Sequence, residues 1–340
     1  MSFGTTEETP GKHFHLEIRA NYLVTSVDKD QRSIFGETPE ISTSLTPWHG
    51  YAIVRPSISL RPGRHFRPDR VPAHEGLVNC AAMKNRRIAL GRRLRHSPLV
   101  QTLGVRPNID DYSDDELNLL RSVDTIYYPS HLYEDVFLAL GKRVFPANYY
   151  RYMGDKIKQT ELFILLDIPH PRTRFYYGGD KERRILEDFS FPVIAKIPRG
   201  SSRGRGIFLI RTGDDLQRYL KRYSPAYIQE ALPIDRDLRV VLVGGKVVHA
   251  YWRIARRGEF RSNVSQGARI CLQSIPASGL RFAERVARLC HFGEVGLDIC
   301  YCSDKYLVLE ANMVYGLEGF RTAGLDIYQL LTQRVSEGEI

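Results

Sequence analysis

The stretch G-L-D-I-C-Y-C-S-D-K-Y-L-V-L-E-A-N, residues 296–312, decides how this chain is interpreted. On either side of Ser303-Asp304-Lys305 the residues are mostly Leu, Ile, Val, Tyr and Cys. That composition favours two neighbouring β-strands, and the polar residues between them favour a turn. We therefore expect residues 297–302 and 306–311 to form a β-hairpin.

The register of this hairpin determines which polar side chains meet. With a three-residue turn, Cys302 pairs with Tyr306, and counting along the ladder places Asp298 opposite Glu310. Asn312 lies two residues further on, so it points to the same face. Facing carboxylates repel unless a cation or a shared proton neutralises them. Two carboxylates and an amide oxygen are hard ligands that suit Mg²⁺ with bound phosphate. The alternative is a hairpin whose acidic residues are simply solvated, and a four-residue turn would break the register.

Composition describes an ordinary globular protein. The 340 residues leave room for two or three domains, and 43% hydrophobic with 26% charged residues is typical of a water-soluble chain. No apolar run is long enough to span a membrane and no signal pattern opens the chain, so we expect a cytoplasmic location. The five cysteines show no paired spacing that indicates a disulfide framework. Cys300 and Cys302 share a strand face, where small buried hydrophobes are favoured over a soft-metal pair.

The net charge of +10 raises the question of nucleic-acid binding. Residues 1–82 carry as many acidic as basic side chains, so the excess lies in the rest of the chain. There the arginines are spread among glycine loops and strand ends, where phosphate esters or carboxylates are the natural ligands. No motif with interleaved aromatic residues indicates a nucleic-acid module.

Breaker residues divide the chain. Residues 1–82 are rich in Pro, Gly, Ser, Thr and His, and we expect a loosely ordered extension there. Met83 opens M-K-N-R-R-I-A-L-G, which resembles the start of a cytoplasmic reading frame, so the extension is also a candidate for an over-called translation start. Abundant native peptides from residues 1–80 in mass spectrometry would refute that idea. We expect a small α/β domain over 83–150 and a larger α+β domain over 151–334.

Helices and strands alternate from residue 113 onward, with Ser113 and Glu116 forming a capping box. Gly244-Gly245 has the spacing of a two-residue hairpin. The pattern predicts helices over 113–122, 132–140, 155–166, 181–188, 214–223, 279–291 and 324–334, and strands over 123–128, 143–145, 173–177, 192–197, 206–210, 226–230, 238–243 and 246–254.

Three further features carry chemistry. In K-I-P-R-G-S-S-R-G-R-G, residues 196–206, Lys196 ends an apolar strand and a glycine-rich loop follows. Such a loop can wrap backbone N–H groups around phosphate, although by itself it is also typical of a mobile hairpin tip. Lys156 stands at a helix start, which is unfavourable to the helix dipole unless an anion holds it, the alternative being a surface lysine. Arg239 and Arg253 flank a hairpin that leads to E-F-R-S-N and are suited to clamping an anion.

The order of these features resembles a known family. D-K-x-K-Q-T, F-P-V-I-A-K, G-S-S-R-G-R-G-I, Y-I-Q-E-A, D-L-R-V-V-L-V-G-G-K, G-E-F-R-S-N, G-L-D-I and L-E-A-N follow one another as in the ATP-grasp carboxylate–amine ligases, in particular the RimK-like glutamate ligase branch. The resemblance covers about 150–330. It implies an ATP-grasp fold of two α+β subdomains closing on ATP, preceded here by the small α/β domain.

The resemblance also assigns roles to individual residues. It implies ATP contacts for Lys156, Lys196, the loop residues Gly200, Ser201, Ser202, Gly204 and Gly206, the linker residues Glu230 and Ala231, Asp237, and Arg261, Ser262 and Asn263. It implies that Asp298, Glu310 and Asn312 hold Mg²⁺, with Mn²⁺ as an alternative. Arg239 and Arg253 are the candidates for stabilising an acylphosphate.

The implied activity is ATP-dependent formation of a C–N bond between a carboxylate and an amine through an acylphosphate, which would add an amino acid such as glutamate to an acceptor. Ser265 and Gln266 replace the family's His and Arg, Trp252 replaces a Glu, and M-V-Y-G (313–316) replaces S-S-P-G. A bulky Trp252 and Tyr315 favour a larger or more apolar acceptor unless both belong to the core. The alternatives are an ATP-binding protein of this fold without activity and a basic nucleic-acid-binding protein. The identities of acid and amine, the number of residues added and the oligomeric state stay open.

Overall fold

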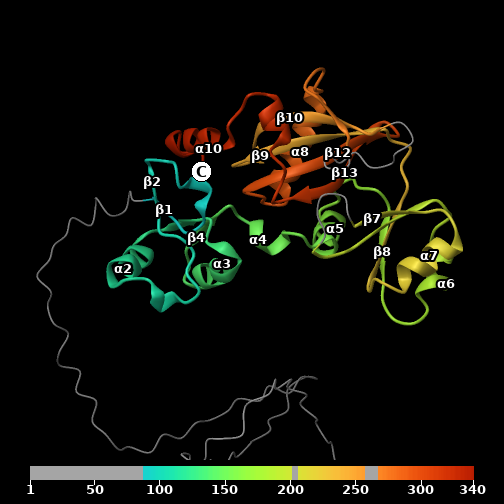
Figure 1. Ribbon diagram of the computed structural model, residues 1–340, viewed down its shortest axis with the longest axis horizontal. Coiled ribbons are helices and arrows are strands. Elements are labelled where there is room, and N and C mark those ends of the chain that lie inside the picture. The colour runs from blue at the N-terminus through green and yellow to red at the C-terminus, as the bar shows by residue number, and fades with distance from the viewer. Residues whose placement is uncertain (1–86, 201–205, 257–266) are drawn as a thin grey trace, which may run out of the picture. The chain divides into compact units, whose positions relative to one another are not determined.

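The computed structural model describes residues 87–200, 206–256 and 267–340, all within one compact unit of the chain (Figure 1). The expected extension over 1–82 lies outside the described residues. The division of the chain at about residues 82 and 150 stays a prediction. No helix in the described ranges is long and apolar enough to cross a membrane.

The first described segment forms a small parallel sheet with the strand order β2-β1-β3-β4. Its strands are β1 (Arg87–Ala89), β2 (Val100–Thr102), β3 (Thr125–Tyr127) and β4 (Arg143–Phe145). Helix α2 (Asp114–Ser122) precedes β3, and α3 (Ser130–Ala139) connects β3 to β4. The predicted capping box at the start of α2 is confirmed, because Ser113 Oγ accepts from the Glu116 N–H and the Glu116 carboxylate accepts from the Ser113 N–H.

The second segment is an antiparallel sheet with the order β5-β8-β6-β7. After α4 (Tyr149–Tyr152) and α5 (Lys156–Leu165), its elements are β5 (Thr173–Tyr176), α6 (Lys181–Asp188), β6 (Val193–Lys196), β7 (Ile207–Ile210), α7 (Gly213–Leu220) and β8 (Ala226–Glu230). Helices α6 and α7 bury Ile185 and Leu216 against the sheet residues Val193 and Ala195. The glycine-rich loop therefore joins two antiparallel neighbours, as its strand-to-strand position predicted.

The third segment is a five-stranded sheet with the order β11-β10-β9-β12-β13. Its strands are β9 (Arg236–Val243), β10 (Lys246–Ile254), β11 (Arg269–Cys271), β12 (Glu294–Cys302) and β13 (Lys305–Asn312), and its helices are α8 (Ala277–Leu289), α9 (Glu318–Thr322) and α10 (Ile327–Ser336). Figure 1 shows α8 beside this sheet, in keeping with its contacts to β9, β10 and β12.

The two faces of the five-stranded sheet pack against different parts of the chain. Leu238, Val240 and Leu242 of β9 point to the face that α8 covers. On the opposite face, Val241 and Val243 pack against a cluster that includes residues of α9 and α10. The remaining part of that second face carries charged side chains instead of apolar ones. The predicted site residues Asp237, Arg239, Asp298 and Glu310 lie on this part of the face.

The hairpin turn differs from the expectation. Ser303 and Asp304 form a two-residue turn with φ values of 50° and 59°, the left-handed conformation that tight hairpins require. Cys302 consequently pairs with Lys305 and not with Tyr306. A three-residue turn was therefore a wrong prediction.

A β-bulge restores the predicted pairing further along the hairpin. The register shifts between Ile299, which pairs with Val308, and Asp298, which pairs with Glu310, so that Leu309 is an extra residue on β13. The bulge compensates for the shorter turn. The predicted position of Asp298 opposite Glu310 is thereby confirmed.

Candidate functional site

A cavity of about 360 Å³ lies between the antiparallel β5-β8-β6-β7 sheet and the five-stranded sheet. Its volume is typical of small-molecule sites. Its apolar walls come mainly from β6, β7, the segment after β8 and β13, and include Ile194, Ile207, Leu209, Leu232 and Leu309. Its polar side chains are Lys196, Gln229, Glu230, Asp237, Arg253, Asp298 and Glu310. Six of these polar residues were predicted from the sequence; Gln229 was not.

The linker after β8 passes along the cavity. Glu230 and Ala231 both line it. The Glu230 carboxylate accepts from the Arg172 N–H (2.7 Å), and the Glu230 N–H donates to the Arg172 carbonyl (2.9 Å). These two bonds fix the end of β8, so the following backbone is held at the cavity wall.

Lys196 ends β6 inside the site. Its side chain is buried, its Nζ donates to the Leu309 carbonyl (3.3 Å), and it lies 5.6 Å from the centre of the Tyr227 ring. Burial lowers the pKa of Lys196 to about 8, and Lys156 acts in the same direction while Glu310 and Asp298 oppose it. The carbonyl that holds Lys196 belongs to the bulged residue of β13.

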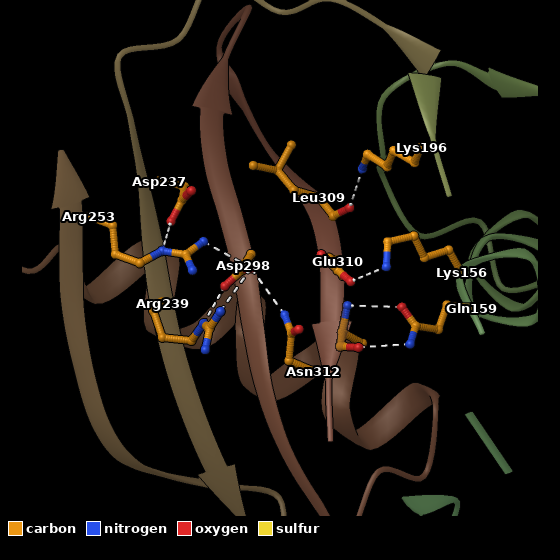
Figure 2. A network of polar contacts seen from close by, with 11 residues as sticks. Lys156, Gln159, Lys196, Asp237, Arg239, Arg253, Asp298, Leu309, Glu310 and Asn312 are labelled. Carbon is orange, nitrogen blue, oxygen red and sulfur yellow. Dashed lines mark hydrogen bonds and ion pairs between the residues drawn. The ribbon is translucent and has the colours of Figure 1, made fainter. Parts of the chain in front are cut away.

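Lys156 opens α5 and is buried. Its Nζ lies 2.8 Å from Glu310 Oε1 across the site (Figure 2). The expectation that an anion holds this lysine is met by a carboxylate of the chain itself. Asp155 caps the same helix end, because its Oδ1 accepts from the Lys158 N–H (3.0 Å).

Asp298 is the centre of a buried charge network (Figure 2). Arg239 contacts both of its oxygens, Arg253 Nη2 lies 2.9 Å from Oδ2, and Asn312 Nδ2 donates to Oδ2 (3.1 Å). Arg253 also donates from Nε to Asp237 Oδ1 (2.6 Å). Burial alone would raise the pKa of Asp298, but the two guanidinium charges outweigh it and lower that pKa. The carboxylate is therefore held ionised and fixed in direction.

The donor set fits a hard divalent cation. Asp298 and Glu310 line the same cavity from facing positions on β12 and β13, and Asn312 contacts Asp298. Mg²⁺ commonly binds to proteins through one or two carboxylates together with substrate phosphates. Among the described residues no group of three or more His, Cys, Asp and Glu side chains is arranged to hold a metal; the predicted set has two carboxylates and one amide.

Helix α5 contributes two polar residues to which the sequence analysis gave no role. Gln159 donates from Nε2 to the Ala311 carbonyl (2.8 Å) and accepts the Ala311 N–H at Oε1 (3.2 Å). Thr160 Oγ1 is hydrogen-bonded to the hydroxyl of Tyr227 on β8 (2.9 Å). Lys156, Gln159 and Thr160 are spaced i, i+3, i+4 and therefore share one face. That spacing of polar residues on a helix was the available signal.

The glycine-rich loop is described only at its two ends. The Gly200 N–H donates to the Gly154 carbonyl (3.2 Å), and the Ile197 N–H donates to the Gly206 carbonyl (2.7 Å). Arg199 Nε donates to Asp155 Oδ2 (2.8 Å), which ties the loop's first residues to the start of α5. Several predicted residues lie outside the described part of the chain: Ser201, Ser202, Gly204, Arg261, Ser262 and Asn263, together with the substitutions Ser265 and Gln266.

The other departures from the family pattern lie in or against the core. Trp252 packs on the α8 side of the sheet and donates from Nε1 to the Ser274 carbonyl (3.3 Å). Tyr315 and Met313 are buried, and of the 313–315 segment only Val314 is exposed. Trp252 and Tyr315 both pack in or against the core, and neither lines the cavity. Cys300 is also buried, and burial raises the pKa of its thiol to about 12, as expected of a small core residue.

The overall fold matches solved structures of one fold class. The RimK domain ATP-grasp protein from Sphaerobacter thermophilus superposes with a TM-score of 0.53 at 16% identity, covering 73% of this chain and 98% of that one. The D-alanine–D-alanine ligase from Bacillus anthracis gives a TM-score of 0.53 at 13% identity, covering 75% and 100%. The fold is ATP-grasp, as predicted.

The family follows from sequence. The family model of the RimK-like ATP-grasp domain matches residues 153–335, more than half of the chain, and the protein belongs to this family. Similar curated proteins are a probable alpha-L-glutamate ligase from Alkalilimnicola ehrlichii (30% identity, 54% of this chain and 65% of that protein), beta-citrylglutamate synthase B from Danio rerio (31%, 47% and 42%) and the ribosomal protein bS6–L-glutamate ligase from Escherichia coli (31%, 51% and 60%). The matches span less than two thirds of the length of these relatives.

Proposed function

We propose that this protein is an ATP-dependent carboxylate–amine ligase. One observation carries the proposal: Lys196, Asp298 and Glu310 border one cavity whose remaining walls are largely apolar. Such a cavity suits a nucleotide, because its base requires apolar walls and its phosphates require cations.

The apolar part of the cavity is the proposed adenine site. We propose that the backbone of Glu230 and Ala231 contacts the adenine base there. Asp237 is proposed to contact the part of the nucleotide outside the base. Lys156 and Lys196 are the proposed phosphate contacts. Gly200, Ser201, Ser202, Gly204 and Gly206 are proposed to fold over the phosphates, and Arg261, Ser262 and Asn263 to approach them.

Asp298, Glu310 and Asn312 are the proposed holders of Mg²⁺ or Mn²⁺. When bound, such an ion neutralises phosphate charge during transfer. Lys156 and the two arginines balance the charge of the carboxylates. Arg239 and Arg253 remain candidates for stabilising an acylphosphate; their contacts with Asp298 support a second role, which is to fix that carboxylate.

The proposed reaction needs no side-chain nucleophile. An oxygen of the substrate carboxylate attacks the γ-phosphorus of ATP, and ADP leaves, so the acid becomes an acylphosphate. The amine then attacks the acyl carbon, and inorganic phosphate leaves with formation of the C–N bond. The side chains of the site position the reactants and stabilise charge.

The names of the relatives guide the choice of substrates. Several are glutamate ligases, and one, by its name, makes a citryl-glutamate. We propose glutamate as the first amino acid to test, with a small carboxylate or a peptide or protein end as its partner.

Phosphate release tests the activity. Wild-type protein with Mg²⁺ and ATP is incubated with pairs drawn from a panel of amino acids and carboxylates that includes glutamate and citrate. We expect release that depends on both members of one pair. We expect Lys196→Ala and Glu310→Ala to reduce that rate by at least about 100-fold while the fold persists, because the first removes a cation that contacts phosphate and the second removes a ligand of the divalent cation.

A matched control is Lys158→Ala, which removes an exposed lysine on α5 two residues from Lys156 and should leave the rate unchanged. Nucleotide binding without phosphate release for any pair would indicate an ATP-binding protein without ligase activity. Full turnover in Glu310→Ala would refute the metal role.

A further inference from the structure

A second buried charge cluster lies outside the cavity, at the first residue of β12. Glu294 is fully buried. Its Oε1 accepts from Arg93 Nε (3.0 Å) and from the Tyr315 hydroxyl (2.6 Å), and its Oε2 accepts from the Tyr128 hydroxyl (2.6 Å). Arg93 Nη2 also donates to the Tyr315 hydroxyl (2.8 Å). The proposed reaction uses none of these four side chains.

The cluster joins two layers of the fold. Arg93 follows β1 in a 3₁₀ turn (Arg92–Leu94), and Tyr128 follows β3, so both come from the carboxyl ends of adjacent parallel strands. In open parallel sheets this edge, at the point where the strand order reverses, is the usual place for a ligand. Here a carboxylate from another sheet of the same chain occupies it. A buried charge with this many partners is costly to displace.

The same cluster connects the two strands of the β12–β13 hairpin at the end opposite its turn, where β12 begins and β13 ends. Glu294 lies four residues before Asp298 on β12, so the two side chains share a face about 13 Å apart along the strand. Tyr315 lies three residues after Asn312, the last residue of β13. The hydrogen bond between Tyr315 and Glu294 therefore ties the two chain segments together just beyond the pair formed by Gly296 and Asn312.

Gly296 allows the Tyr315 side chain to pack directly on the backbone of β12. A Cβ at this position would lie 2.9 Å from Tyr315 Cβ and 3.1 Å from Tyr315 Cγ. The Tyr315 side chain thus lies directly against the β12 backbone between Glu294 and Asp298. A displacement of Tyr315 would be transmitted to Gly296 and to Asn312, its cross-strand partner.

We infer that Arg93, Glu294 and Tyr315 form a clamp that positions Asp298 and Asn312 for the divalent cation, so that the small parallel sheet contributes to the metal site without touching it. The inference rests on the proposed metal role of the hairpin. Arg93, Glu294 and Tyr315 are positioning residues, because none of them lines the cavity.

Two tyrosine variants separate positioning from general stability. Tyr315→Phe and Tyr128→Phe each remove one hydroxyl that donates to Glu294 at 2.6 Å. Of these two tyrosines, only Tyr315 follows Asn312 closely in the chain and packs on Gly296. Gly296→Ala is a further variant that displaces Tyr315 while keeping every hydroxyl group.

The measurement is Mn²⁺ binding to the full-length protein, followed by electron paramagnetic resonance with a non-hydrolysable ATP analogue present, alongside thermal unfolding. We expect Tyr315→Phe and Gly296→Ala to weaken Mn²⁺ binding about tenfold, and Tyr128→Phe to change it less than about twofold. Equal weakening in both tyrosine variants, or none in Tyr315→Phe, would overturn the clamp alone. A wild-type protein that binds no Mn²⁺ would overturn the clamp together with the proposed metal site.

Discussion

At the level of single residues, Lys196 shows how the surroundings of a side chain alter its chemistry. Burial brings its pKa down to about 8, so its charge is sensitive to conditions in which an ordinary lysine stays protonated. Asp298 shows the opposite balance, because two arginines overcome the effect of burial and keep it ionised. The site thus holds one cation that can lose its charge and one anion that cannot easily do so.

The lowered pKa of Lys196 predicts a pH dependence of nucleotide binding. Phosphate binding favours the protonated amine, which is present below about pH 8 and lost as the pH rises through that value. We expect the Kd of a non-hydrolysable ATP analogue to increase between about pH 7 and pH 9, by at most about tenfold per pH unit above the pKa. Calorimetry in two buffers should also detect proton uptake on binding near pH 8.

A variant with a permanent charge is the control for this dependence. In Lys196→Arg the guanidinium stays protonated throughout the range, so the pH dependence should disappear even if the affinity is lower. A wild-type Kd that is constant from pH 7 to about pH 9 would contradict the assigned role of Lys196 in phosphate binding.

At the level of elements, the hairpin and α5 form one unit. Sequence reasoning found the facing carboxylates because the turn is one residue shorter than expected and the bulge at Leu309 adds one residue back. The predicted pairing of Asp298 with Glu310 is correct because these two errors cancel, although the prediction included neither the shorter turn nor the bulge. Periodicity alone could not reveal the bulge, because one extra residue does not change the composition of the strand; in the folded chain the Lys196 ammonium donates to the carbonyl of that extra residue, Leu309.

Gln159 supplies a test of how α5 supports the hairpin. Its side-chain amide bonds both backbone groups of Ala311 on β13, an edge strand of the sheet. Gln159→Ala would leave these buried groups unpaired, so we expect the free energy of unfolding to fall by about 2 kcal/mol. Chemical denaturation measures the change.

The neighbouring Glu161→Ala is the matched control, because it alters an exposed position of the same helix and should leave stability nearly unchanged. If Gln159→Ala is as stable as the wild-type protein, the bond to Ala311 does not support the hairpin.

At the level of the whole molecule, the order of motifs along the chain predicted more than any single motif. The ATP-grasp fold and the RimK-like family are confirmed, and most strand and helix positions from residue 113 onward agree with the structure. The sequence analysis missed the three-residue strands β2 and β11 and the short helices α4 and α9, because such short elements show no periodicity. It also missed the Glu294 cluster, whose members are up to 222 residues apart. Only the folded chain brings them together.

The fate of a labelled oxygen tests the central claim most directly. The carboxylic acid that supports phosphate release is prepared with ¹⁸O in its carboxylate and incubated with the protein, Mg²⁺, ATP and the amine. Attack of the carboxylate on the γ-phosphorus predicts one ¹⁸O atom in each phosphate released, detected by mass spectrometry. Phosphate that carries no label would mean that water or another group attacks ATP, and would contradict ligation through an acylphosphate.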